Sequence, residues 1–169
     1  RNATQILEFA GMPSSLVATK NLDYIEATKE LKAGDIDAFF CTAGLTTTVI
    51  DELSKECDIR LIPLTDTVIS KMLESSSAYT SEVIPAGTYT GQDTAISTIG
   101  VKSVLITKSD VSDDTIEQLT SLLFEKENEL SYSNSLKLEL TYDFATDGIP
   151  IPFHNGAKRY YEDCGYSIN

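Results

Sequence analysis

The fold predicted for this chain depends on the stretch Gly34-Asp35-Ile36-Asp37-Ala38-Phe39-Phe40-Cys41-Thr42-Ala43-Gly44. Gly34 suits the left-handed position that ends a helix, because a residue without Cβ meets no steric penalty there. The apolar run 36–41 predicts a short strand buried on both faces. Residues 42–44 follow the carboxyl end of that strand, where ligands bind in open α/β sheets. A new helix is expected near 46–48, so its free N–H groups would lie close to a corner suited to a small anion or polar ligand.

Helical and extended patterns alternate through the first half of the chain. Apolar residues at helical spacing predict helices over 3–9, 23–32, 47–55 and 66–73. A second strand is expected over 59–64, where Pro63 implies an edge position or the end of the strand. The order strand, helix, strand favours a parallel pair joined by a right-handed crossover.

The second half of the chain begins with extended segments and becomes mainly helical. Residues 79–93 hold Pro and two Gly and predict a loop flanked by extended chain, while 95–107 is extended and rich in β-forming residues. Helices are then expected over 113–127 with Ser112 as cap, between 129 and 144, and up to 163 with Asn155 as cap. The chain is therefore predicted to be α/β, with a natural seam near 96–104.

The charge of the chain limits its partners. It has 169 residues, of which 41% are hydrophobic, and 26 acidic against 13 basic side chains give a net charge of −13. Such a surface repels phosphate backbones and anionic lipid, so neither nucleic-acid binding nor docking on a membrane surface is expected. No apolar run approaches the about 20 residues that span a bilayer. The chain begins at Arg1 without Met or a signal peptide, so we expect a piece of a longer product.

Cysteine and histidine are too few for a metal centre or a standard catalytic pair. Cys41, Cys57 and Cys164 lack metal-motif spacing and are expected to be buried free thiols. His154 is the single histidine, which rules out a zinc site made of several histidines and weakens any Ser-His or Cys-His scheme. No Asp-x-Asp-x-Asp-Gly loop is present, so calcium binding is not expected either. We expect no metal and no cofactor.

Several separate motifs, in order along nearly the whole chain, resemble one protein family. They are residues 34–40, Thr42-Ala43-Gly44, Ile84-Pro85-Ala86-Gly87-Thr88-Tyr89-Thr90-Gly91-Gln92, Leu123-Phe124-Glu125 and Ile151-Pro152-Phe153-His154-Asn155-Gly156-Ala157-Lys158-Arg159-Tyr160-Tyr161. Their sequence and spacing resemble the TAXI family, the extracytoplasmic solute receptors of TRAP transporters. The chain departs from the family pattern at Cys41, where an aromatic residue is usual, and at Asn155, where Pro is common.

The resemblance implies a fold, a function and a location. The fold would be that of a type II periplasmic binding protein, with residues 1–95 as most of lobe two, 96–107 as a crossing strand and hinge, and 108–169 returning to lobe one as mainly helical chain. The protein would be a receptor, not an enzyme, that binds a small carboxylate or amino acid such as glutamate in the cleft between the lobes. It would act in the periplasm or at the cell surface, with a lipid anchor through a preceding N-terminal region as one option. Because much of one lobe would precede Arg1, we expect weak or no ligand binding by this chain alone.

Two groups of residues are predicted to contact the ligand. Cys41, Thr42, Ala43 and Gly44 form the first group, and an ordinary turn between strand and helix, with Cys41 as a packing residue, is the alternative. Backbone N–H groups at this corner suit a carboxylate. Tyr89 and Gln92 form the second group, because the resemblance brings their loop toward the cleft; packing of the tyrosine beneath the loop is the alternative.

The resemblance also suggests a contact with the membrane permease of the transporter. His154 and Tyr160 would take part, on an outer face of lobe one that Lys158, Arg159 and Tyr161 complete as an exposed polar and aromatic surface. The simpler interpretation of His154 is a residue just ahead of a helix cap.

Two other functions stay open from the sequence. One is a small α/β enzyme that uses Cys41 as nucleophile, which needs a base within hydrogen-bonding distance, and His154 is the one candidate. The other is a surface-exposed, immunogenic lipoprotein whose main role is contact with a host or another protein.

Overall fold

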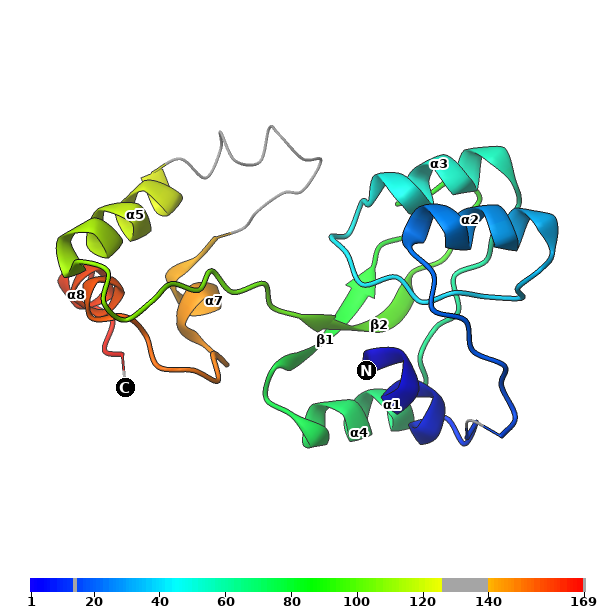
Figure 1. Cartoon of the computed structure of the whole chain (residues 1–169), viewed down its shortest axis with the longest axis horizontal. Coiled ribbons are helices and arrows are strands. Elements are labelled where there is room, and N and C mark those ends of the chain that lie inside the picture. The colour runs from blue at the N-terminus through cyan, green and yellow to red at the C-terminus, as the bar shows by residue number, and fades with distance from the viewer. Residues whose placement is uncertain (14, 126–139, 169) are drawn as a thin grey trace. The chain divides into compact units, whose positions relative to one another are not determined.

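The computed structural model describes residues 1–13, 15–125 and 140–168, which form two compact units (Figure 1). Unit 1 is Arg1–Val101 and unit 2 is Lys102–Asn169. The boundary between them lies inside the extended segment 95–107, and each unit buries side chains of its own.

Unit 1 contains four helices and a hairpin among its described residues. They are α1 (Asn2–Phe9), α2 (Tyr24–Ala33), α3 (Thr48–Glu56), α4 (Asp66–Ser75), β1 (Tyr79–Ile84) and β2 (Ile96–Val101). The helices begin and end within about two residues of the predicted ranges, which confirms those predictions. Local signals explain the agreement at α2: Asp23 and Glu26 form a reciprocal capping box, and Gly34 ends the helix in the left-handed conformation at φ 79°.

The sheet differs from the predicted one. β1 and β2 pair antiparallel, from Tyr79 opposite Val101 to Ile84 opposite Ile96. The segments 36–41 and 59–64, predicted as parallel strands, are not strands in the structure. Among the described residues, no backbone group of 36–41 pairs with another segment, and 59–64 makes one such bond, from Leu64 N–H to the Ser97 carbonyl at 2.9 Å.

The physical reason for this correction is that an apolar run supplies side chains but no partner for its backbone. A strand exists only where its N–H and C=O groups meet those of a neighbouring strand. The run 36–41 accordingly lies at the surface instead of inside a sheet, and Phe40 keeps 46% of its area exposed. Ile62, in the second run, is 71% exposed. Strand pairing within the predicted extended segment 95–107 ends with β2 at Val101, and Ile106 beyond it is 73% exposed.

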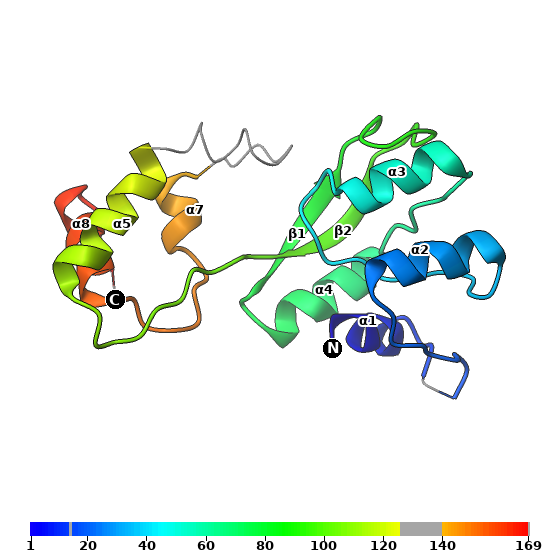
Figure 2. The same ribbon diagram turned by 45° about the horizontal axis from the view of Figure 1, so that its top comes forward.

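The core of unit 1 lies between its first and fourth helices. Ile6 of α1 packs with Val68 and Met72 of α4, and Met72 is completely buried. The two helices lie side by side next to the hairpin (Figure 2). A second buried group, Ala27, Ile50 and Leu53, comes from α2 and α3, which pack on each other.

Unit 2 contains three helices among its described residues, α5 (Asp113–Glu125), α7 (Tyr142–Thr146) and α8 (Asn155–Asp163). Ser112 accepts a hydrogen bond from Thr115 N–H at 3.2 Å and caps α5 as predicted. The cap of α8 is His154, whereas the sequence predicted Asn155. The predicted helix between 129 and 144 lies largely outside the described residues.

Aromatic side chains pack on one another among the helices of unit 2. Phe124 stacks on Tyr142 with ring centres 4.5 Å apart, and Tyr142 in turn lies 4.9 Å from Tyr166. The remaining members of this aromatic cluster are Phe153, Tyr160 and Tyr161. Tyr161 is buried, so the prediction that it belongs to an exposed surface is wrong. The reason is that α8 turns this ring toward Phe124 and Phe153.

Candidate functional site

The residues Thr42, Ala43 and Gly44, called here the 42–44 corner, are exposed on unit 1. They lie in the irregular segment between α2 and α3. Thr47 is the residue before α3, and its side chain makes no capping hydrogen bond. The first N–H groups of a helix lack partners within the helix itself, so α3 presents donors and a positive end near the corner.

A tyrosine hydroxyl holds the start of the corner. Tyr24, the first residue of α2, donates its hydroxyl hydrogen to the Thr42 carbonyl oxygen at 3.0 Å. The same hydroxyl oxygen accepts a hydrogen bond from the Thr42 N–H at 3.1 Å. Both backbone groups of Thr42 are therefore satisfied by one side chain, as a neighbouring strand would satisfy them.

A second tyrosine hydroxyl holds the far side of the corner. Tyr89 is 6% exposed, and its hydroxyl donates to the Leu45 carbonyl oxygen. The hydroxyl oxygen also accepts from the Thr47 N–H at 3.4 Å. Tyr89 thereby joins the loop after β1 to the turn before α3. Burial raises the pKa of Tyr89, and this favours the neutral phenol, which both donates and accepts.

Gln92 keeps the loop that carries Tyr89 in shape. Its Nε2 donates to the carbonyls of Pro85 and Thr94 at 2.9 and 3.1 Å, and its Oε1 accepts from Tyr89 N–H at 3.2 Å. Gly91 adopts φ 77°, a conformation that favours glycine. The structure thus uses both polar ends of Gln92 inside the loop, although the sequence suggested that they would contact a ligand.

Cys41 lies beside the same tyrosines and is half-buried. Burial raises the pKa of its thiol, and a hydrogen bond with Tyr24 acts in the opposite direction. The three cysteines are free, but Cys57 is only half-buried and Cys164 is exposed, so the prediction of three buried thiols is wrong in that respect.

The thiol of Cys41 is expected to react slowly with alkylating reagents. A raised pKa means less thiolate at any pH below it, and the thiolate is the reacting form. At pH 8, with iodoacetamide and peptide mass spectrometry, Cys41 should be labelled several-fold more slowly than the exposed Cys164. Adding urea to unfold the chain should remove the difference. Equal labelling rates in the folded protein would contradict this prediction.

The comparison with known proteins concerns almost the whole chain. The model of the NMT1-like family matches residues 1–165. The chain belongs to the NMT1-like family. This is a family of periplasmic-binding-protein-like proteins, which supports an α/β binding-protein fold, a small-molecule ligand and a binding role in place of catalysis. Such proteins are typically extracytoplasmic.

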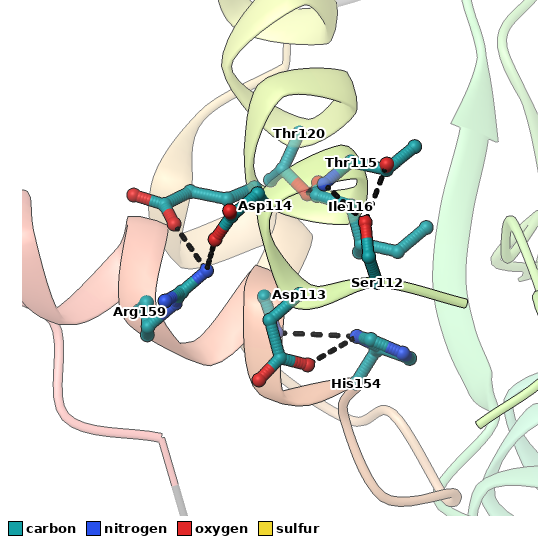
Figure 3. A network of polar contacts seen from close by, with 10 residues as sticks. Ser112, Asp113, Asp114, Thr115, Ile116, Thr120, His154 and Arg159 are labelled. Atoms are coloured by element: carbon teal, nitrogen blue, oxygen red, sulfur yellow. Dashed lines mark hydrogen bonds and ion pairs between the residues drawn. The ribbon is translucent and has the colours of Figure 1, made fainter. Parts of the chain in front are cut away.

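The second region of interest in this NMT1-like protein lies where α5 and α8 meet (Figure 3). The Nδ1 of His154 accepts the Gly156 N–H at 3.1 Å and lies 3.7 Å from a carboxylate oxygen of Asp113. Only 9% of the His154 side chain is exposed, and its Nε2 has no hydrogen-bond partner in the described structure. The imidazole is therefore the cap of α8 itself, whereas the simpler interpretation of the sequence places His154 just ahead of the cap.

Ion pairs continue along the same seam of the NMT1-like chain. Arg159 binds Asp114 at 2.7 Å and Glu117 at 2.8 Å (Figure 3). Tyr160 lines a shallow depression of about 340 Å³ with Asp114, Glu117, Gln118 and Ser121. These pairs are partly exposed and contribute little stability each.

The described part of the chain holds neither a cluster of metal ligands nor a helix that could span a membrane. Among residues 1–13, 15–125 and 140–168, no group of three His, Cys, Asp or Glu side chains is placed to hold a metal ion. In the same part of the chain, every helix is too short or too polar to cross a bilayer.

Proposed function

We propose that this NMT1-like chain carries the ligand corner of an extracytoplasmic solute receptor of the TAXI type, working with a TRAP permease. The ligand class is a small carboxylate or amino acid, with glutamate as the representative. The single observation that supports this site is an exposed 42–44 corner whose shape is fixed from both sides by tyrosine hydroxyls. Family membership supports the receptor role itself.

The chemistry of the corner favours an anionic group on the ligand. In the described structure the N–H groups of Ala43 and Gly44 have no protein acceptor, whereas the Thr42 N–H is taken by Tyr24. Backbone N–H groups near the start of a helix bind carboxylates and phosphates, because the donors and the helix dipole act in the same direction. A hydrogen bond to an ionised carboxylate is roughly twice as strong as one between neutral groups.

The partnership with a permease is the second part of the proposal. Tyr160 is half-buried and lines the depression beside α5, whereas only 9% of the His154 side chain is exposed at the start of α8. The catalytic alternative has less support. The raised pKa of Cys41 keeps its thiol protonated, and the Nδ1 of the one histidine, His154, is already engaged by the Gly156 N–H.

A pair of substitutions at Ala43 tests the ligand corner. Ala43 is exposed, so Ala43→Glu leaves packing intact but places a second carboxylate beside the ligand's own. Like charges about 4 Å apart near a protein surface repel by roughly 1–4 kcal/mol, which predicts at least a fivefold loss of affinity. Ala43→Gln has the same size without the charge and should bind much better than Ala43→Glu.

The measurement is isothermal titration calorimetry with glutamate on the natural gene product that contains these residues. Mass spectrometry of small molecules carried through purification of the same protein would identify the solute independently. Equal affinities for the Glu and Gln variants would place the ligand elsewhere. Absence of any bound carboxylate, together with no glutamate binding, would remove the proposed ligand class.

A further inference from the structure

The 42–44 corner is ordered without the strand that the sequence predicted ahead of it. Residues 36–41 pair with no other described backbone segment, so no ladder of hydrogen bonds supports the corner from that side. An exposed loop without such support samples several shapes, and a ligand that binds one of them has to order the loop first. Some other feature must therefore keep the corner in one shape.

Two phenol hydroxyls supply that support in the same manner. Tyr24 satisfies the C=O and the N–H of Thr42, and Tyr89 satisfies the C=O of Leu45 and the N–H of Thr47. Toward the backbone, each hydroxyl donates once and accepts once, as a strand partner does. The two rings come from different elements, the first turn of α2 and the loop that Gln92 maintains. The corner is thus held at its start and just beyond its end.

The clamps also determine which donors are left for a ligand. The Thr42 and Thr47 N–H groups are already engaged by the tyrosines. The N–H groups of Ala43 and Gly44 lie between the two clamped points and have no acceptor in the described part of the chain. Two adjacent donors on a fixed turn match the two oxygens of one carboxylate better than a single donor would.

We infer that Tyr24 and Tyr89 are positioning residues that preset the 42–44 corner so that the Ala43 and Gly44 N–H groups receive a ligand carboxylate. The inference rests on the proposed function for its ligand. The part of the inference that concerns structure, that the two tyrosines fix the shape of the corner, does not rest on the proposed function, because these hydrogen bonds exist without any ligand. Neither tyrosine needs to touch the ligand to affect its affinity.

Tyrosine-to-phenylalanine variants test the inference, because they delete one oxygen and keep the ring. Tyr24 is 38% exposed, so Tyr24→Phe leaves the fold intact, and Tyr89→Phe is the second variant. Tyr79→Phe is the matched control in the same unit, since among the described residues the Tyr79 hydroxyl binds side chains, those of Asn2 and Gln5, and no backbone group. Hydrogen exchange is followed in peptides spanning 40–48 of the natural gene product, and glutamate affinity is measured by calorimetry.

Losing the two backbone hydrogen bonds that one hydroxyl makes predicts a roughly tenfold or greater acceleration of exchange in peptides 40–48 for each variant, and a similar loss of glutamate affinity. The Tyr79→Phe control should change neither quantity. Unchanged exchange in both variants would overturn the inference. Faster exchange with unchanged affinity would overturn it too, because the tyrosines would then order a turn and not a ligand site. Failure of the proposed function is distinguishable, since the unsubstituted protein would then bind no glutamate.

Discussion

Gly156→Ala is expected to disrupt unit 2. A Cβ at this position would lie 2.1 Å from the Asp113 carbonyl oxygen and 2.9 Å from the Glu117 nitrogen. Both are backbone atoms of α5, so no side chain can rotate away and the two helices must separate. Overpacking of this kind costs about 1–3 kcal/mol and occasionally more, and we expect at least the upper end of that range. In a helix with free space around the glycine, the same substitution would raise the free energy of unfolding by about 1 kcal/mol. A fall in stability would therefore show that the clash with α5 outweighs the better helix propensity of alanine.

The measurement for Gly156→Ala uses the aromatic cluster as its reporter. The chain has no tryptophan and eight tyrosines, of which Tyr142, Tyr160, Tyr161 and Tyr166 belong to this cluster. The near-ultraviolet circular dichroism of tyrosine should therefore weaken, and the urea midpoint of that signal should fall. Gly100→Ala is the comparison, because the three atoms nearest to its Cβ would belong to side chains of Glu82 and Thr80 and not to the backbone. A midpoint as high as that of Gly100→Ala would show that the helices adjust without cost.

Met72→Ala is expected to cause the largest loss of stability in unit 1. Met72 is the one side chain among the described residues that is large and completely buried, and it packs with Ile6 and Val68. Removing a buried Met side chain costs about 2–5 kcal/mol, because the apolar contacts are lost and a cavity remains. Because Ile6 lies on α1, the loss should also release that helix from α4.

Hydrogen exchange measured by region is the suitable readout for Met72→Ala, since two units need not unfold together. Peptides from α1, α4 and the hairpin should exchange faster, while those from α5 and α8 should not change. Leu73→Ala is the matched control on the same helix, because Leu73 is 38% exposed and should cost far less. Similar effects of the two substitutions would mean that α1 does not depend on this contact.

The sequence indicates those features of the candidate site that depend on neighbouring residues, but not the contacts made between distant ones. The sequence predicts the 42–44 corner because small residues after an apolar run are a local signal. The sequence also predicts Tyr89 as a ligand contact, whereas the structure shows its hydroxyl bonded to backbone groups 42 and 44 residues away. Tyr24 was missed, because a tyrosine at the start of an amphipathic helix carries no sign of the turn 18 residues later that it holds.

The cap of α8 shows the same limit at short range. Asn155 is the better cap by residue preference, yet His154 takes the position and accepts the Gly156 N–H. In the structure the imidazole is also next to Asp113 at the start of α5. The residue that caps α8 is thus also the one that lies against α5. Capping preferences measured on single helices take no account of such a contact between helices.

The amino-acid sequence by itself determined the helices of this protein, because their hydrogen bonds and caps join residues at most about four positions apart. The capping box at Asp23, the left-handed Gly34 and the acidic first turn of α5 all act within that distance. Tertiary structure alone decided which extended segments became strands and which tyrosines fixed the 42–44 corner. Those features need a partner from a distant part of the chain, and an apolar run or a lone hydroxyl does not specify which partner it will meet.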